Sequence, residues 1–131
     1  MIQFEVNGIP ARQGSKNLIR RGGKAWMVES DKNLPTWRDA IKRAAPNLEA
    51  PLNIPLTVSA EIRLASPKKP QFEAPATRNA GDLDKYARAI GDALEQAGVI
   101  RDDSRICRWR LTKRFAKEGE QLGALITIEP Y

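Results

Sequence analysis

Aspartates gather at both ends of one predicted helix, in a pattern suited to metal binding. Asp82 and Asp84 flank Leu83 where the helix is expected to begin, and Asp102 and Asp103 follow just beyond its far end. Asp103 can approach the first pair only if the chain folds back along the helix. Neighbouring carboxylates raise one another's pKa values, and Mg²⁺ removes that repulsion because it prefers oxygen ligands. A helix cap plus solvated turn aspartates is the alternative interpretation.

The polar face of the same helix carries a basic residue and a glycine. Arg88 lies about 40° around the helix from Asp84, where it can clamp a phosphate oxygen beside a metal ion. The same spacing also allows an ordinary surface pair between Asp84 and Arg88, worth about 0.3–0.5 kcal/mol. Gly91 projects within about 20° of Asp84. A glycine there costs roughly 1 kcal/mol of helix stability, which indicates close packing or close approach by DNA.

Composition narrows the chemistry. The 131-residue chain contains no histidine and one cysteine, Cys107. The absence of histidine excludes Ser-His-Asp and Cys-His machinery, so catalysis must come from carboxylates, Lys, Arg, Tyr or a bound metal. A single cysteine forms no intramolecular disulfide, and the sequence has neither a membrane-spanning stretch nor a signal peptide. We therefore expect a cytoplasmic protein with no membrane partner.

The charge is unevenly distributed. The chain has a net charge of +6, yet the segment 82–103 holds six acidic and three basic residues. The remainder holds 19 basic and 10 acidic residues. An acidic island in a basic surrounding suits a metal-dependent enzyme that acts on nucleic acid, because the island holds cations and the surroundings hold phosphates. Chance clustering produces such islands too.

Hydrophobic periodicity predicts a single α+β (mixed α/β) domain over residues 1–131, with a short mixed sheet and two main helices. Period-2 alternation predicts strands at 2–7, 56–64, about 105–115 and about 122–129. Helical spacing predicts a first helix between Pro35 and Pro46. The second helix runs from Asp82, a candidate N-cap, to Gly98, a candidate C′ glycine.

Two segments and one strand face have features suited to contact with a partner. Residues 8–30 are basic and glycine-bearing, and Gly22-Gly23 can turn a hairpin. Residues 65–80 contain three prolines and no periodicity, as expected of an exposed loop. In the strand near 105–115, odd positions including Cys107 are expected to be buried. The even positions are expected to face phosphate: Arg108, Arg110 and Arg114.

Residues 81–104 carry a family resemblance. The runs GDLDKYARAIGDAL (81–94) and GVIRDDS (98–104) resemble the signature of RusA-type Holliday junction resolvases. That signature consists of a D-L-D, a helix with a basic residue and a D-A-L, and a G-hydrophobic-hydrophobic-x-D-D turn. The pair Trp37-Arg38 resembles the family's first helix more weakly.

The resemblance implies a small, homodimeric, Mg²⁺-dependent endonuclease of phage or bacterial cytoplasm that nicks four-way DNA junctions symmetrically. We expect Mn²⁺ to substitute for Mg²⁺. Asp82, Asp84 and Asp103 match the family's metal-binding carboxylates. Asp102 matches the adjacent aspartate, and Asp92 the one inside D-A-L.

The chain departs from the family pattern at Arg88, where a functional lysine is common. Arginine keeps the charge that stabilises a phosphate but is a poor proton donor. Lys85 is a nearby substitute, although it points about 100° away from Asp84.

These observations predict a junction-resolving endonuclease with Asp82, Asp84, Asp103 and Arg88 as catalytic residues. Contacts to DNA phosphates are assigned to the basic ribbon, the helix and the strand: Arg12, Lys16, Arg20, Arg21, Lys85, Arg108, Arg110 and Arg114. Two alternatives remain open. One is a non-catalytic architectural DNA-binding module, and the other is a Mg²⁺-dependent nucleotide phosphohydrolase, which would not need so basic an exterior.

Overall fold

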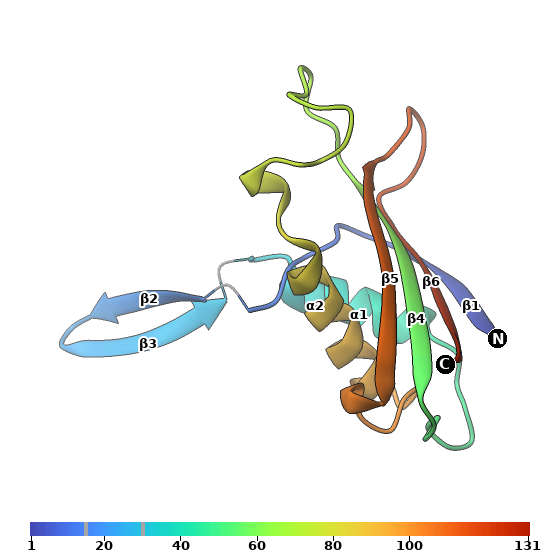
Figure 1. Ribbon diagram of the computed structural model, residues 1–131. Coiled ribbons are helices and arrows are strands. Elements are labelled where there is room, and N and C mark those ends of the chain that lie inside the picture. The colour runs from blue at the N-terminus through green and yellow to red at the C-terminus, as the bar shows by residue number, and fades with distance from the viewer. Residues whose placement is uncertain (15, 30) are drawn as a thin grey trace.

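Four strands form a mixed sheet. The computed structural model describes residues 1–14, 16–29 and 31–131. The sheet order is β1-β6-β4-β5 (Figure 1). Its strands are β1 (Ile2–Asn7), β4 (Leu56–Leu64), β5 (Ile106–Phe115) and β6 (Gly123–Pro130). β6 runs antiparallel to both β1 and β4, whereas β4 and β5 are parallel. A parallel pair needs a long crossover, which here carries the second helix.

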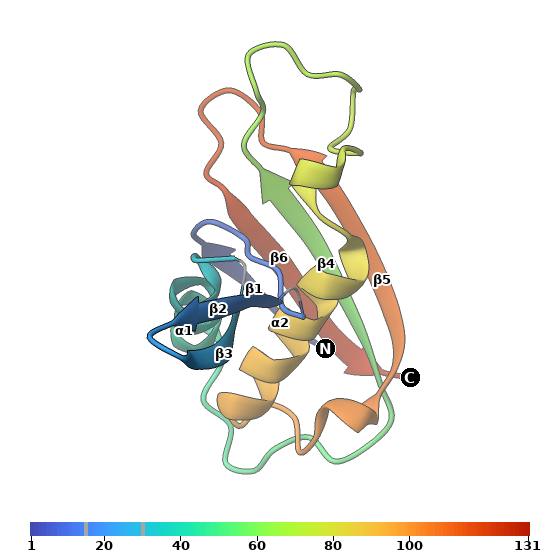
Figure 2. The ribbon, with the colours of Figure 1, turned by 90° about the vertical axis from the view of Figure 1, so that its left-hand side faces the viewer.

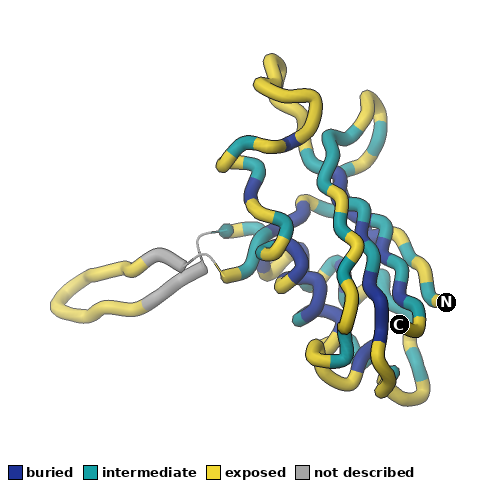
Figure 3. The backbone as a smooth tube through the Cα atoms, viewed as in Figure 1, coloured by how far each residue is buried: buried dark blue, intermediate teal, exposed yellow. Residues whose placement is uncertain are grey.

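Two helices cover one face of the sheet, α1 (Leu34–Ala44) and α2 (Leu83–Gln96) (Figure 2). Trp37 and Ile41 of α1 are fully buried, as are Ile90 and Leu94 of α2. They belong to one core with the alternating apolar residues of β4 and β6. Figure 3 shows buried residues along both the helices and the strands. The α+β class predicted from the sequence is confirmed.

The glycine positions agree with the sequence-based expectations. Gly22 and Gly23 have positive φ angles of 59° and 75° and turn a hairpin between β2 (Lys16–Arg21) and β3 (Lys24–Glu29). Gly98 follows the C-cap residue of α2, Ala97, with a φ of 76°, as a C′ glycine does. Between residues 65 and 80 the chain is a mainly exposed loop that ends in a short 3-10 turn, η1 (Arg78–Ala80).

Asp82 occupies the N-cap position of α2, as the sequence predicted, although its side chain makes no capping hydrogen bond. One local prediction was wrong. Cys107 is exposed rather than buried. The register between β4 and β5 shifts at this point, with Leu56 opposite Ile106 and Thr57 opposite Arg108. The unpaired extra residue of such a bulge breaks the alternation of side chains, and Cys107 therefore leaves the core face.

Candidate nuclease site

A pocket of about 600 Å³ lies between α2 and β5. Acidic, basic and apolar side chains line it together: Gln13, Asp84, Ala87, Arg88, Gly91, Asp92, Asp103, Ile106, Trp109 and Leu111. Three of the sequence-predicted site residues, Asp84, Arg88 and Asp103, therefore share one cavity. Its apolar wall comes from β5, and its charged wall comes from the polar face of α2.

Helical geometry explains the charged wall. Residues at 84, 88, 91, 92 and 95 return to nearly the same side of a helix with 3.6 residues per turn. Asp84 and Arg88 do not form an ion pair in the described part of the chain. The Arg88 guanidinium instead lies against the backbone at Gly14, where an added Cβ would collide with it. Arg88 is exposed and lines the pocket.

Gly91 forms the floor of the pocket. A Cβ added there would lie 3.6 Å from Cζ2 of Trp109 and 3.8 Å from Cβ of Asp103, which are ordinary contact distances. Close packing therefore does not demand glycine at this position. The missing side chain leaves room in the pocket beside Trp109 and Asp103.

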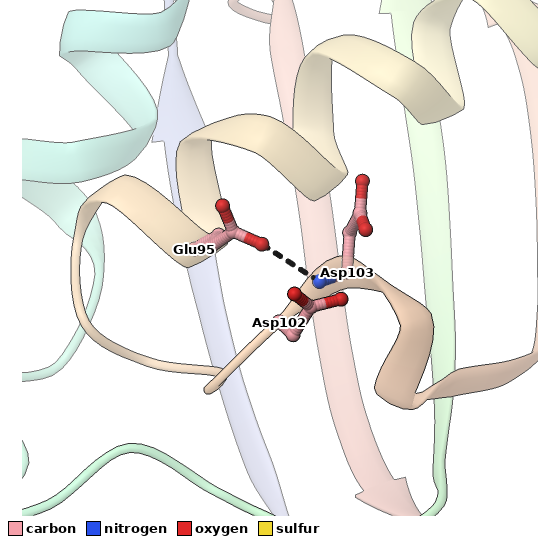
Figure 4. Close-up of side chains that lie close together, drawn as sticks. All are labelled: Glu95, Asp102 and Asp103. Atoms are coloured by element: carbon pink, nitrogen blue, oxygen red, sulfur yellow. Dashed lines mark hydrogen bonds between the residues drawn. The ribbon is translucent and has the colours of Figure 1, made fainter.

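Asp103 folds back onto the second half of α2, beside Glu95 (Figure 4). The backbone N–H of Asp103 donates to Oε1 of Glu95 at 2.9 Å, at the start of a 3-10 turn, η2 (Asp103–Arg105). Partial desolvation raises the pKa of Asp103, and the carboxylates of Glu95, Asp102 and Asp92 raise it further. A cation near Asp103 would relieve this repulsion.

Asp102 has a different role from its neighbour. Its Oδ1 accepts a hydrogen bond from the backbone N–H of Ser104 at 2.8 Å. Hydrogen bonding with the Ser104 side chain, and then with its backbone N–H, lowers the pKa of Asp102 below its ordinary value. Among the described residues, Glu95, Asp102 and Asp103 place carboxylate oxygens within 4.8 Å of one another. All three are exposed.

Asp82 lies apart from this group, at the other end of the pocket-lining helix. The nine residues from Asp82 to Gly91 correspond to about 13 Å along a helix axis. Two hydrogen bonds hold the backbone just before Asp82. Lys113 donates to the carbonyl of Gly81 at 2.5 Å, and the Tyr86 hydroxyl donates to the carbonyl of Ala80 at 2.5 Å. Within the described chain, Asp82, Asp84 and Asp103 do not form a group with oxygens within 4.8 Å.

The segment before the hairpin joins the site to both helices. The Gln13 backbone N–H donates to the carbonyl of Lys85 at 3.0 Å. Its side-chain amide donates to Oδ2 of Asp92 and accepts from Nη1 of Arg38 at 3.1 Å. Arg12 is half-buried, packs over Gly81 and donates its backbone N–H to Asp31 at 3.0 Å. These bonds of Arg12 and Gln13 fix the base of the hairpin beside the pocket.

The basic residues predicted to bind DNA are divided among three places. Arg20 and Arg21 are exposed on the hairpin, whereas the Lys16 side chain lies outside the described residues. The Arg12 guanidinium is 3.4 Å from the carboxylate of Asp31. Lys85 is half-buried and lies outside the pocket lining. Their contacts with DNA stay predictions.

The remaining arginines lie on the sheet face that the helices leave open. Arg108 stacks on Tyr131 at 4.6 Å, and Arg110 lies 3.8 Å from Glu129. Arg114 is paired with Glu61 at 2.9 Å and with Glu120 at 2.7 Å. These acidic partners neutralise much of the positive charge that the sequence pattern placed on this face. Their presence weighs against Arg114 as a phosphate contact.

Sequence reasoning missed three residues around the pocket: Gln13, Glu95 and Trp109. Helical spacing could have found Glu95, because position 95 lies within about 20° of Asp84. Trp109 was assigned to the buried face of its strand, but its contact with Gly91 was not foreseen. No local pattern singles out Gln13, which reaches Asp92 across 79 positions of sequence.

The fold and pocket define an α+β protein with carboxylates and an arginine in one cavity, a combination suited to phosphodiester chemistry. The family model of endodeoxyribonuclease RusA matches residues 8–129. The chain therefore belongs to the RusA endodeoxyribonuclease family. A search of the curated proteins gives no match. Within its described residues, the protein has no helix long and apolar enough to cross a membrane.

Proposed function

We propose that this protein is a Mg²⁺-dependent endonuclease that resolves four-way DNA junctions by paired symmetric nicks, in recombination and repair. The observation that carries the proposal is the shared pocket of Asp84, Arg88 and Asp103 in a chain of the RusA family. The proposed setting is the cytoplasm of a bacterium, where Cys107 stays reduced.

Asp82, Asp84 and Asp103 are the proposed ligands of the metal ion. The donor set fits Mg²⁺ because it offers carboxylate oxygens alone, and Mn²⁺ is expected to replace it. The raised pKa of Asp103 supports a cation beside it. Bound there, Mg²⁺ supplies activation of water and stabilisation of the leaving oxygen. Asp82 lies apart from Asp103. A competing donor set is therefore Asp103 with its neighbours Glu95 and Asp102.

The side chains of the pocket have separate proposed roles. Arg88, at the rim, places its guanidinium against a phosphate oxygen and stabilises the charge that grows on it during cleavage. Asp92 is held by Gln13 on the same wall and keeps the carboxylates in a fixed arrangement. Arg20 and Arg21 on the hairpin bind phosphates outside the pocket.

The working unit is proposed to be a homodimer. A four-way junction presents two symmetry-related strands for cleavage, and a two-fold dimer brings one site to each of them. Mixing wild-type subunits with Asp84→Asn subunits tests this point on a supercoiled cruciform plasmid. Heterodimers should yield nicked circles, whereas wild-type dimers should yield linear product. A monomer in light scattering, both free and on the junction, would contradict the dimer.

The central experiment incubates the protein with a synthetic four-way junction and with linear duplex, in Mg²⁺ or in EDTA. Cleavage of the junction alone, and only with Mg²⁺, is expected. Asp82→Asn, Asp84→Asn and Asp103→Asn should each abolish nicking and retain junction binding, while Glu95→Gln should keep activity. Loss of activity in Glu95→Gln with full activity in Asp82→Asn would favour the competing donor set.

The two alternatives give different results in the same assay. Binding without any metal-dependent nicking would indicate an architectural module. Hydrolysis of small nucleotide phosphate esters, with the junction intact, would indicate a phosphohydrolase.

A further inference from the structure

The hairpin formed by β2 and β3 projects away from the rest of the protein (Figure 1). Its strands pair with each other and, among the described residues, with no third strand. A two-stranded ribbon is only marginally stable in water, because it has no core to bury its side chains. Such a ribbon gains order when a partner covers it.

One face of this ribbon has an apolar pair followed by a cationic pair. Ile19 lies opposite Trp26, and Arg21 lies opposite Lys24 next to the turn. Positions two apart in a strand share a face, so all four side chains stand on the same side of the ribbon. The exposed fractions of Ile19 and Trp26 are 36% and 44%. An aromatic ring and an aliphatic side chain therefore lie open to solvent directly behind two cations.

The charge of the ribbon favours a polyanionic partner over a second protein surface. Residues 16–28 contain four basic residues and no acidic residue. Phosphate contacts alone leave the apolar pair unexplained, since Trp26 and Ile19 offer nothing to a phosphate. Nucleic-acid bases do offer a surface, because aromatic side chains stack on them.

The base of the ribbon is anchored beside the pocket, and this anchoring limits how far from the pocket the tip of the ribbon lies. Asp31 accepts hydrogen bonds from the backbone of Arg12 and of Asn33, and Gln13 lines the pocket beside Asp84 and Asp103. A six-residue strand extends about 20 Å, which equals about six phosphate spacings along one DNA strand. The apolar pair thus lies a few nucleotides from a phosphate bound in the pocket.

We propose that Trp26, backed by Ile19, stacks on a base exposed at the branch point of a DNA junction, while Arg21 and Lys24 contact the flanking phosphates. This proposal rests on the proposed function and adds the feature by which the protein distinguishes branched from linear DNA. Linear duplex keeps its bases stacked inside the helix. A branch point interrupts this stacking and leaves base faces available to the indole ring.

Binding measurements on the Asp84→Asn background separate stacking from charge. Trp26→Ala should weaken junction binding about tenfold, with linear duplex affinity and the salt dependence of binding unchanged. Trp26→Phe should retain most of the preference because it keeps an aromatic face. Arg21→Gln is the matched charge control. It should weaken binding to both substrates and make the log–log salt slope shallower by about one.

A cross-linking experiment locates the contact directly. Irradiated junctions with 5-iodouracil at the branch point should cross-link to Trp26, and junctions with the analogue in mid-arm should not. An equal loss of junction and duplex affinity in Trp26→Ala, or no loss, would overturn the proposal. Conversion of a dimer to a monomer by Trp26→Ala would overturn it too, and would assign the ribbon to a second copy of the chain. Cleavage by the wild-type protein is scored separately, so branch-selective binding without nicking would count against the proposed function alone.

Discussion

Gln13 connects Asp92 of α2 to Arg38 of α1. The side-chain amide of Gln13 donates to Oδ2 of Asp92, and its carbonyl oxygen accepts from Nη1 of Arg38 at 3.1 Å. The side chain is therefore satisfied at both ends, and the carboxylate of Asp92 is fixed on the pocket wall. Because Gln13 also precedes the hairpin, one residue couples the basic ribbon to the acidic pocket.

Gln13→Ala should lower the rate of junction cleavage at saturating protein about tenfold, with the junction Kd changed less than threefold. Its loss frees Asp92 to move, and catalytic groups depend on sub-ångström placement. Single-turnover kinetics and anisotropy measure the two quantities. Gln3→Ala is the matched control, since Gln3 bonds to Thr127 on the open face of the sheet. A parallel change in rate and affinity would assign Gln13 to DNA binding instead.

Gly91→Ala should stabilise the protein and impair cleavage. Alanine is favoured over glycine in a helix by about 1 kcal/mol, and the added methyl meets Trp109 and Asp103 at ordinary contact distances. The same methyl occupies the pocket floor, where a phosphate or hydrated metal needs room. Thermal unfolding should show a higher Tm, and the junction assay a lower rate. Wild-type cleavage by Gly91→Ala would show that substrate does not approach the floor.

The adjacent aspartates Asp103 and Asp102 should have opposite effects on stability in metal-free buffer. The pKa of Asp103 is raised by desolvation and by neighbouring carboxylates, so its ionisation destabilises the folded state as pH rises above the ordinary value of 3.8. Asp103→Asn should therefore raise the Tm slightly at pH 7. The pKa of Asp102 is lowered by its bond with Ser104, so Asp102→Asn should lower the Tm above that pH.

Adding Mg²⁺ gives the companion measurement. The ion should raise the Tm of the wild-type protein, because it binds the folded state and offsets the repulsion at Asp103. The Asp103→Asn variant should show a much smaller rise. An equal rise in both proteins would place the bound ion elsewhere.

Arg114 and Arg110 test whether the open sheet face meets DNA. Arg114 lowers the pKa of Glu120 to about 2. The stability from this pair is thus present above the ordinary Glu value of 4.5 and lost as pH falls towards 2. Arg114→Gln should lower the Tm at pH 7 and leave the salt slope of DNA binding unchanged. Near pH 2 the Tm of the variant should approach that of the wild-type protein.

Arg110→Ala should make the log–log salt slope of DNA binding shallower by about one. An unchanged slope in both would remove this face from the DNA interface.

The secondary structure was largely predictable because it depends on short-range pattern. The alternation at 56–64 gave the bounds of β4, the apolar stripe and the two prolines gave α1, and Gly22-Gly23 gave the hairpin turn. Periodicity failed at Cys107, since a bulge depends on how β5 pairs with β4 and not on its own sequence. The sequence also placed Asp84 and Arg88 on one side of α2, and in the structure both residues line the same pocket.

The sequence by itself determined which residues carry charge on one side of α2, because neighbours on a helix are fixed by local geometry. Only the tertiary structure decided their partners. The parallel crossover from β4 to β5 brings Asp103 back to the level of Gly91 and Glu95 rather than to Asp82. Packing of the segment before the hairpin against α2 places Gln13 on Asp92, and sheet pairing gives Arg114 two carboxylate neighbours. These contacts join residues far apart in the chain, so they depend on the packing of whole elements, which local periodicity does not encode.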